Sequence, residues 1–231
     1  MSVVRVNQIQ DTSTNVAANI SGGVVTFTNT PLGITPPAIV KLVTLNLSNA
    51  ADATISSTYI NSTYDTYKFI YDFLPTLDSA ELYTRAIVGG SEDTGNNYGF
   101  ETLPLDGGST RQNDSTNVMA VHNKYQIGNG AGEGISGEFT LFNVNSTTRA
   151  ACISGHSTAF TSTPVPSQNV FGGSYKSDQR AKVLNGLRLF METSSDVSNI
   201  ASGFITVYGV VKWVYLEQIK YKIRLVILLW W

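Results

Sequence analysis

Charged residues are scarce in this sequence. Lys, Arg, Asp and Glu make up 14% of the 231 residues, against about 25% in ordinary soluble domains. Ser, Thr, Asn and Gly take their place. The formal net charge is −2, so the chain lacks the basic balance typical of nucleic-acid readers. We therefore expect no nucleic-acid partner.

Cysteine and long apolar runs are also scarce. Cys152 is the single cysteine, which excludes an intrachain disulfide framework. The longest apolar run, residues 225–231, is too short to span a bilayer, and the first residues lack the apolar segment of a signal peptide. We expect synthesis in a cytoplasm, no standard secretion and no membrane insertion.

Strand patterns dominate what is present. Many short runs of alternating apolar and polar residues are separated by clusters of Gly, Pro, Asn and Ser, as in sandwiches and barrels. The clearest is "YKFIYDFL" at residues 67–74, which has one wholly aromatic face. We predict an all-β, jelly-roll-like antiparallel sandwich of two sheets. Its expected inward side chains are Phe69, Tyr71, Phe73, Leu187, Leu189 and Val207.

The ends of the chain differ from its middle. Residues 1–30 hold two short strand patterns, too little for a stable hairpin in water, and predict a β anchor that needs a partner surface. A proline-rich connector at 31–37 then leads to a head domain at 38–212 and an apolar tail at 213–231. The residues expected to make assembly contacts are Val4, Val6, Ile9, Val25, Phe27, Trp213, Tyr221 and Leu225.

The tail combines strand and interface signals. All three tryptophans lie in it, and apolar residues from Ile219 to Leu225 alternate with Lys220, Lys222 and Arg224. This period of two predicts a strand rather than an amphipathic helix. We expect it to pack on a sister chain or a neighbouring protein, although a stretch without a role is the alternative.

Candidates for catalysis are few. His122 and His156 lie on predicted strands without metal-ligand spacing, so each is interpreted as a half-exposed strand histidine. Cys152 lies in an apolar strand context, which is typical of a buried thiol rather than a nucleophile. No pair of carboxylates stands out as a glycosidase would need. We predict no catalytic residue and no enzyme.

Two loops carry residue types that also occur in ligand sites. Glu92 and Asp93 lie in a glycine-rich loop that does not match a regular calcium loop, so a solvated hairpin tip is favoured. Residues 127–137 carry five glycines, but strands flank them where a dinucleotide fingerprint needs a following helix. They predict a long flexible loop. No metal site and no cofactor are expected.

Tyrosines near residue 60 are the remaining candidates for ligand contact. Tyr59, Tyr64, Tyr67 and Tyr71 fall within one short stretch. The alternation assigns Tyr67 and Tyr71 to the core. Tyr59 and Tyr64 are left as possible contacts to a glycan, because aromatic rings stack on the apolar faces of sugars.

Three segments carry a resemblance. The ending "LRLFMETSSDVSNIASGFITVYGVVK" (187–212) and the segment "YDTYKFIYDFLPTLDSAELYTRAIVGG" (64–90) resemble small β-sandwich modules of phage virion proteins. The start "MSVVRVNQIQDTS" is similar to the opening of tail-fibre-like and head-fibre-like proteins of aquatic bacteriophages. The likeness covers residues 1–30 and 60–212, and its motifs are turns and packing positions.

This resemblance implies a non-enzymatic virion component, a homotrimer whose β-sandwich head binds the host surface, with host polysaccharide as a possible partner. A fibre-type surface protein is the first expectation. A capsid decoration or cement protein and a jelly-roll shell protein are the alternatives. Each would contact other virion proteins of the tail or capsid and would reside in the virion. The tail after Lys212 departs from the pattern.

Overall fold

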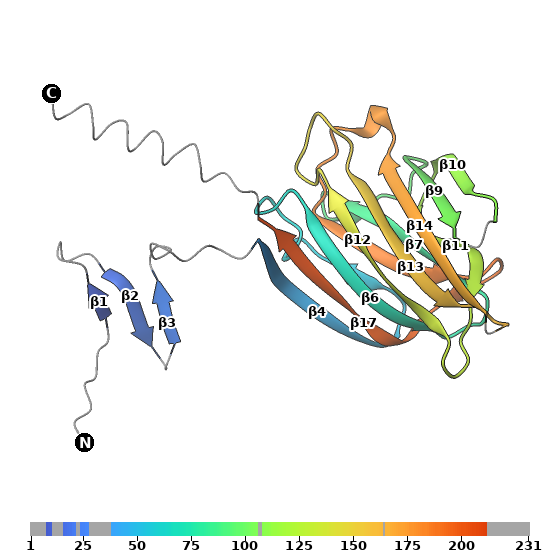
Figure 1. Cartoon of the computed structure of the whole chain (residues 1–231). Coiled ribbons are helices and arrows are strands. Elements are labelled where there is room, and N and C mark those ends of the chain that lie inside the picture. Colours follow the sequence, from blue (N-terminus) through green and yellow to red (C-terminus); the bar gives the residue numbers. More distant parts are fainter. Residues whose placement is uncertain are drawn as a thin grey trace, which may run out of the picture. The chain divides into compact units, whose positions relative to one another are not determined.

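The structure is a computed structural model. It describes residues 8–10, 16–21, 24–27, 38–105, 108–163 and 165–211, and for residues 8–27, 124 and 125 only the backbone. The chain divides into two compact units, Met1–Ala38 and Ile39–Trp231. In the first unit, β1 (Gln8–Gln10), β2 (Val16–Ser21) and β3 (Val24–Phe27) form an antiparallel sheet (Figure 1).

The predicted assembly residues fall partly within this description. Ile9 lies on β1, and Val25 and Phe27 lie on β3. The others lie outside the described residues: Val4, Val6, Trp213, Tyr221 and Leu225.

The second unit contains two sheets. The large sheet has eight strands, in the order β10 (Arg111–Thr116), β9 (Tyr98–Pro104), β14 (Pro166–Tyr175), β13 (Cys152–Phe160), β12 (Gly134–Phe142), β6 (Tyr67–Pro75), β17 (Ile200–Val210) and β4 (Ile39–Ala50). The small sheet has the order β11 (Met119–Ile127), β7 (Ala80–Val88), β15 (Gly186–Glu192) and β16 (Val197–Ser198), with β5 (Ala53–Ile55) on β15 and β8 (Ser91–Glu92) on β7.

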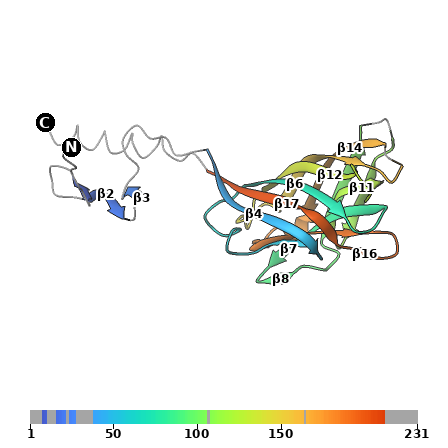
Figure 2. The same cartoon turned by 90° about the horizontal axis from the view of Figure 1, so that it is seen from below.

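The predicted fold class is confirmed. The strand pairs are antiparallel, and Figure 2 shows β6, β12 and β17 in one layer and β7, β8 and β16 in the other. The short 3-10 turn Ser177–Gln179 is the helical element of the described residues. None of their helices has the length and apolarity to cross a membrane.

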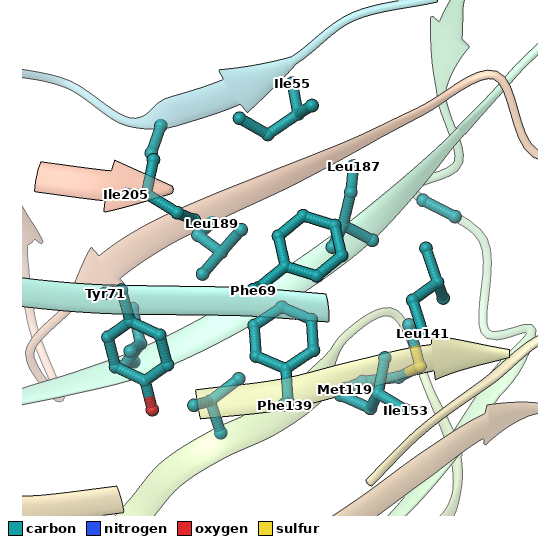
Figure 3. Close-up of a cluster of buried hydrophobic side chains, with 14 of the residues drawn as sticks. Ile55, Phe69, Tyr71, Met119, Phe139, Leu141, Ile153, Leu187, Leu189 and Ile205 are labelled. Atoms are coloured by element: carbon teal, nitrogen blue, oxygen red, sulfur yellow. The ribbon is translucent and has the colours of Figure 1, made fainter. Parts of the chain in front are cut away.

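The core lies between the two sheets. All six side chains expected to face inward are at most 1% exposed: Phe69, Tyr71, Phe73, Leu187, Leu189 and Val207. Phe69 stacks on Phe139 with ring centroids 4.5 Å apart and an interplanar angle of 8°. Figure 3 shows these rings pointing toward Leu187 and Leu189 of the small sheet. The aromatic face of 67–74 therefore joins the two layers.

Glycines open space for the aromatic side chains. Gly155 on β13 lies between Phe139 on β12 and Phe171 on β14 in the strand register. A Cβ on Gly155 would lie 2.5 Å from the Cβ of Phe139, closer than two carbon atoms pack. Its absence lets the two phenylalanine rings meet across the strand, at a centroid distance of 6.2 Å.

The glycine-rich segment 127–137 is shorter as a loop than predicted. β12 already begins at Gly134 and pairs with both β6 and β13. Gly134 has φ = +119°, a backbone conformation that glycine adopts without strain. The second half of the expected flexible loop is therefore a strand in the middle of the large sheet.

We expect Leu189→Asp to prevent folding. Leu189 is fully buried, and an unpaired carboxylate in an apolar core costs several kcal/mol. Leu103→Asp is the matched control, because Leu103 is 44% exposed. Thermal unfolding followed by circular dichroism checks both variants. A folded Leu189→Asp protein with unchanged melting would contradict the core assignment.

Candidate functional site

A polar cavity opens at one end of the sandwich. It has a volume of about 580 Å³, within the range of small-molecule sites. We call it the end pocket. Its lining residues come from β7, β10, β11, β14 and two turns: Glu81, Arg111, Gln126, Thr161, Ser162, Thr163, Val165, Pro166, Ser167 and Ser194.

An ion pair forms the charged part of the end pocket. The guanidinium of Arg111 lies 3.1 Å from Oε1 of Glu81, with side chains 49% and 19% exposed. The hydroxyl of Tyr83 donates to the other carboxylate oxygen, Oε2. Burial, followed by the neighbouring Glu81, raises the pKa of Tyr83, so this phenol stays a donor. Both oxygens of Glu81 are thus held in fixed directions.

Ser167 supplies an unused polar group to the same cavity. The residue is 5% exposed, and its Oγ has no hydrogen-bond partner in the structure. Buried hydroxyls in folded proteins are normally hydrogen-bonded to protein, water or ligand. The orphan hydroxyl on the pocket wall is therefore an observation that points to a bound polar group.

Behind the end pocket, polar side chains continue into the core. The amide of Asn169 and the hydroxyl of Ser157 contact Nδ1 of His122 at 3.0 and 2.9 Å. Asn169 and Ser167 are two residues apart on β14 and both are buried, so they point to the same side of the sheet.

His122 was interpreted from the sequence as a half-exposed strand histidine, which is wrong. Its side chain is fully buried. The pairing of β11 with β7 shifts register between Ala120 and His122, so strict alternation does not apply there. His156 is exposed, opposite Glu138 on β12 and Val170 on β14.

Cys152 and His156 form no dyad. They lie four residues apart on β13, which is about 13 Å along a strand. Burial raises the pKa of the Cys152 thiol, and Arg149 offsets part of that rise. A thiol with a raised pKa is a poor nucleophile.

A second cavity lies on the side of the large sheet that faces away from the core. It measures about 730 Å³, and its lining includes the glycines Gly99, Gly172 and Gly173. Leu103 and Val170, each 44% exposed, are cross-strand partners on its wall. The end pocket holds an oriented ion pair and a buried hydroxyl without a partner, so we favour it as the candidate site.

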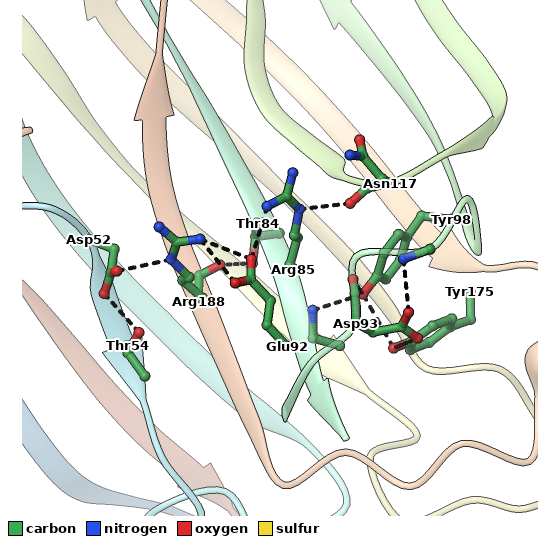
Figure 4. Close-up of polar contacts among 12 residues, drawn as sticks. Asp52, Thr54, Thr84, Arg85, Glu92, Asp93, Tyr98, Asn117, Tyr175 and Arg188 are labelled. Carbon is green, nitrogen blue, oxygen red and sulfur yellow. Dashed lines mark hydrogen bonds and ion pairs between the residues drawn. The ribbon is translucent and has the colours of Figure 1, made fainter. Parts of the chain in front are cut away.

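The loop with Glu92 and Asp93 is neither a solvated tip nor a cation site. Nη1 of Arg188 lies 3.0 Å from both carboxylate oxygens of Glu92, and Nη1 of Arg85 lies 3.0 Å from Oε1 (Figure 4). Asp93 accepts bonds from Lys182 at 2.5 Å and from Tyr175 at 3.0 Å. Both carboxylates are occupied, and the described residues contain no cluster of three or more His, Cys, Asp or Glu that could hold a metal.

Tyr59 and Tyr64 pack partly against the core. The ring of Tyr64 meets Tyr67 edge-on at 5.8 Å, and a Cβ on Gly209 would lie 2.5 Å from that ring. Tyr64 also lines a small cavity of about 200 Å³. Their contact with a glycan stays a prediction.

The residues of the end pocket were missed at the sequence level. None of Glu81, Tyr83, Arg111 and Ser167 belongs to a sequence motif. They lie on β7, β10 and β14, and the packing of the two sheets brings them together. No local sequence pattern marks the site, because Glu81 and Ser167 are more than 80 residues apart in the chain.

We expect the stability contribution of Asp93 to disappear in acid. Burial raises the pKa of this carboxyl, but bonds from Lys182, Asn97, Gly95 and Tyr175 outweigh that effect, and the net pKa is lowered. A lowered folded-state pKa stabilises the fold above the unfolded pKa of about 3.9, and the effect is lost as the pH falls through the folded value.

The test is the difference in unfolding free energy between wild type and Asp93→Asn. We expect wild type to be more stable than Asp93→Asn by about 1.5–3 kcal/mol at pH 7. This difference should stay nearly constant down to about pH 5 and shrink below about pH 4. The exposed Asp78→Asn serves as control. A difference that is the same at pH 2.5 and pH 7 would contradict the assignment.

Comparisons with known proteins are few. No protein family and no curated protein sequence matches the chain. Among solved structures, the marine PL-14 alginate lyase from Aplysia kurodai matches with a TM-score of 0.33 and 8% identity, over 76% of this chain and 87% of that one. A likeness at this level assigns neither a reaction nor site residues to this chain.

The expectation of a non-enzymatic structural protein is corrected by this comparison. The matched structure is an alginate lyase. The fibre, decoration and shell-protein interpretations and the prediction of no enzymatic activity are not kept. The phage-module resemblance rested on turns and packing positions, which sandwiches of many functions share. The homotrimer and the virion location stay predictions. The proposals below are built from side-chain geometry.

Proposed function

We propose that this protein binds a neutral saccharide unit in the end pocket. The observation that carries the proposal is the orphan Oγ of Ser167 in a cavity that also holds a fixed carboxylate–guanidinium pair. Sugars present donors and acceptors on every side, and such a pair offers both kinds of partner.

The rest of the lining suits the same ligand. Four further hydroxyls and the amide of Gln126 face the cavity, and Val165 and Pro166 add an apolar wall. A lining that is mostly polar offers hydrogen-bond partners to the many hydroxyls of a sugar. Apolar surface of this kind accommodates the C–H face of a sugar ring.

Charge favours a neutral ligand over an acidic one. Arg111 is the described cation of the pocket, and Glu81 already neutralises it. A ligand carboxylate would have to compete with Glu81 for that guanidinium, and like charges in proximity are unfavourable. The proposed saccharide site is therefore the end pocket and not the surface near Tyr59 and Tyr64, where the sequence suggested a glycan contact.

The test is saturable binding of the full chain to a panel of neutral oligosaccharides, namely glucans, mannans, galactans and xylans, with uronate oligomers beside them. We expect binding to a neutral member, measured by titration calorimetry. Saturable binding to uronates alone, or to no member, would overturn the proposal.

Ser167→Ala links binding to this pocket. Removing an unsatisfied buried hydroxyl does not weaken the fold, so melting stays the same or rises. Loss of a hydrogen bond worth about 1 kcal/mol weakens the affinity about fivefold. Ser154→Ala is the matched control and should leave the affinity unchanged, because Ser154 lines the second cavity, on the side of the large sheet that faces away from the core. Equal affinity of wild type and Ser167→Ala would place the ligand elsewhere.

A further inference from the structure

Like residues face like residues across two strands of the small sheet. In the register of β7 and β15, Glu81 lies opposite Glu192, Tyr83 opposite Phe190, and Arg85 opposite Arg188. Like charges directly opposite each other destabilise an antiparallel pair. Two of these three pairs therefore need compensation.

The arginine pair is fully compensated. Glu92 bridges both guanidiniums, and Asp52 accepts from Nε of Arg188 at 2.9 Å (Figure 4). Phe190 is 2% exposed and lies between the two guanidiniums, whose Cζ atoms are 4.6 and 4.7 Å from its ring centre. Two carboxylates and one aromatic face thus hold two cations together.

In the glutamate pair, the charge of only one residue is compensated. Glu81 has Arg111 and Tyr83. Glu192 makes no ion pair with any cation whose side chain the structure describes. The fold therefore keeps a second carboxylate beside Glu81 although this arrangement weakens the sheet, and strained arrangements of this kind cluster at functional sites.

The glutamate pair lies at the end pocket. Glu81 lines that cavity, and so does Ser194, two residues after Glu192. Ser167, 5% exposed and without a hydrogen-bond partner, lines it as well. Glu81 and a buried hydroxyl without a partner thus line one cavity, and Glu192 lies beside Glu81 in the strand register.

We infer that Glu81 and Glu192 form a catalytic carboxylate pair that hydrolyses a glycosidic bond of the saccharide in the end pocket. This inference rests on the proposed function. Directly opposed residues of an antiparallel pair have Cβ atoms about 4.5–5.5 Å apart. From Cβ atoms this close, the two side chains can bring their carboxyl groups to the separation of about 5–5.5 Å that is found in glycosidases retaining the anomeric configuration.

The surroundings assign the roles. Arg111 and Tyr83 hold both carboxylate oxygens of Glu81 in place, which orients this residue as a nucleophile. In the first step a Glu81 oxygen bonds to the anomeric carbon, the glycosidic C–O bond breaks, and Glu192 gives its proton to the leaving oxygen. In the second step water attacks the anomeric carbon, Glu192 takes a proton from that water, and the bond to Glu81 breaks. No oxidant or other co-reactant is needed.

The test is release of reducing ends from the neutral oligosaccharides that bind. We expect wild type to release them, and Glu81→Gln and Glu192→Gln each to lower kcat by about a thousandfold or more. Glu192→Gln should keep saccharide affinity within about threefold, because Gln preserves the shape of the side chain, whereas Glu81→Gln also loses the pair with Arg111. Glu101→Gln, exposed on the far face of the large sheet, is the matched control with unchanged kcat.

Stability supplies a second measurement. Glu192→Gln removes a like-charge contact that destabilises an antiparallel pair, so its melting temperature should rise by about 1–3 °C. Glu81→Gln should lower it, because the pair with Arg111 is lost. A folded Glu192→Gln protein with wild-type kcat would overturn the inference.

The outcomes separate the two proposals. Saturable binding without release of reducing ends by wild type overturns the catalytic pair and leaves saccharide binding intact. Absence of binding to every neutral member overturns both. A 2-fluoro glycoside that adds covalently to Glu81, located by peptide mass spectrometry, supports the assigned nucleophile, whereas labelling of another residue contradicts it.

Discussion

The stacking of Phe69 on Phe139 is the contact on which the rest of the sandwich depends. These rings belong to β6 and β12, the adjacent central strands of the large sheet, and they are at most 2% exposed. Aromatic side chains bury more area than any other kind, and here they cover the leucines of β15 in the facing sheet (Figure 3). Once this layer is packed, the register of both sheets is set, because a slip by one residue would turn every core side chain to water.

Five buried polar side chains form a hydrogen-bonded group within this core. Thr102, His122, Asn123, Ser157 and Asn169 are at most 2% exposed, and their hydrogen bonds link β9, β11, β13 and β14. Burying polar groups is unfavourable unless they are hydrogen-bonded, so an apolar filling would be simpler if stability alone mattered. Their position directly behind the end pocket relates the polar core to the proposed ligand site.

Alternation made the central strands predictable from the sequence. The aromatic face of β6 follows a strict period of two, and its inward residues and Val207 of the terminal strand β17 were assigned correctly. β14 was hidden by Pro166 and the Gly172–Gly173 pair, and β10 by its wholly polar sequence "RQNDST". Both gain their strand conformation from pairing with β9, which local propensity does not reveal.

The candidate site was beyond such prediction for a related reason. Glu81 and Glu192 are 111 positions apart, and a carboxylate pair becomes visible only through the register of β7 on β15. Glu92 illustrates the same limit, since its loop sequence suggested a free tip while the fold places it between Arg85 and Arg188. Residues whose role depends on long-range register leave no local pattern.

The central claim is that the end pocket holds a neutral saccharide. A crystal structure of the full chain soaked in a neutral oligosaccharide tests it most directly. We expect a sugar ring between Arg111 and Ser167, with a ring hydroxyl within hydrogen-bond distance of the Ser167 Oγ and the anomeric carbon facing Glu81. Two results would contradict the claim. One is a sugar bound only in the second cavity, beside Leu103 and Val170, and the other is an end pocket that keeps only water at saturating oligosaccharide.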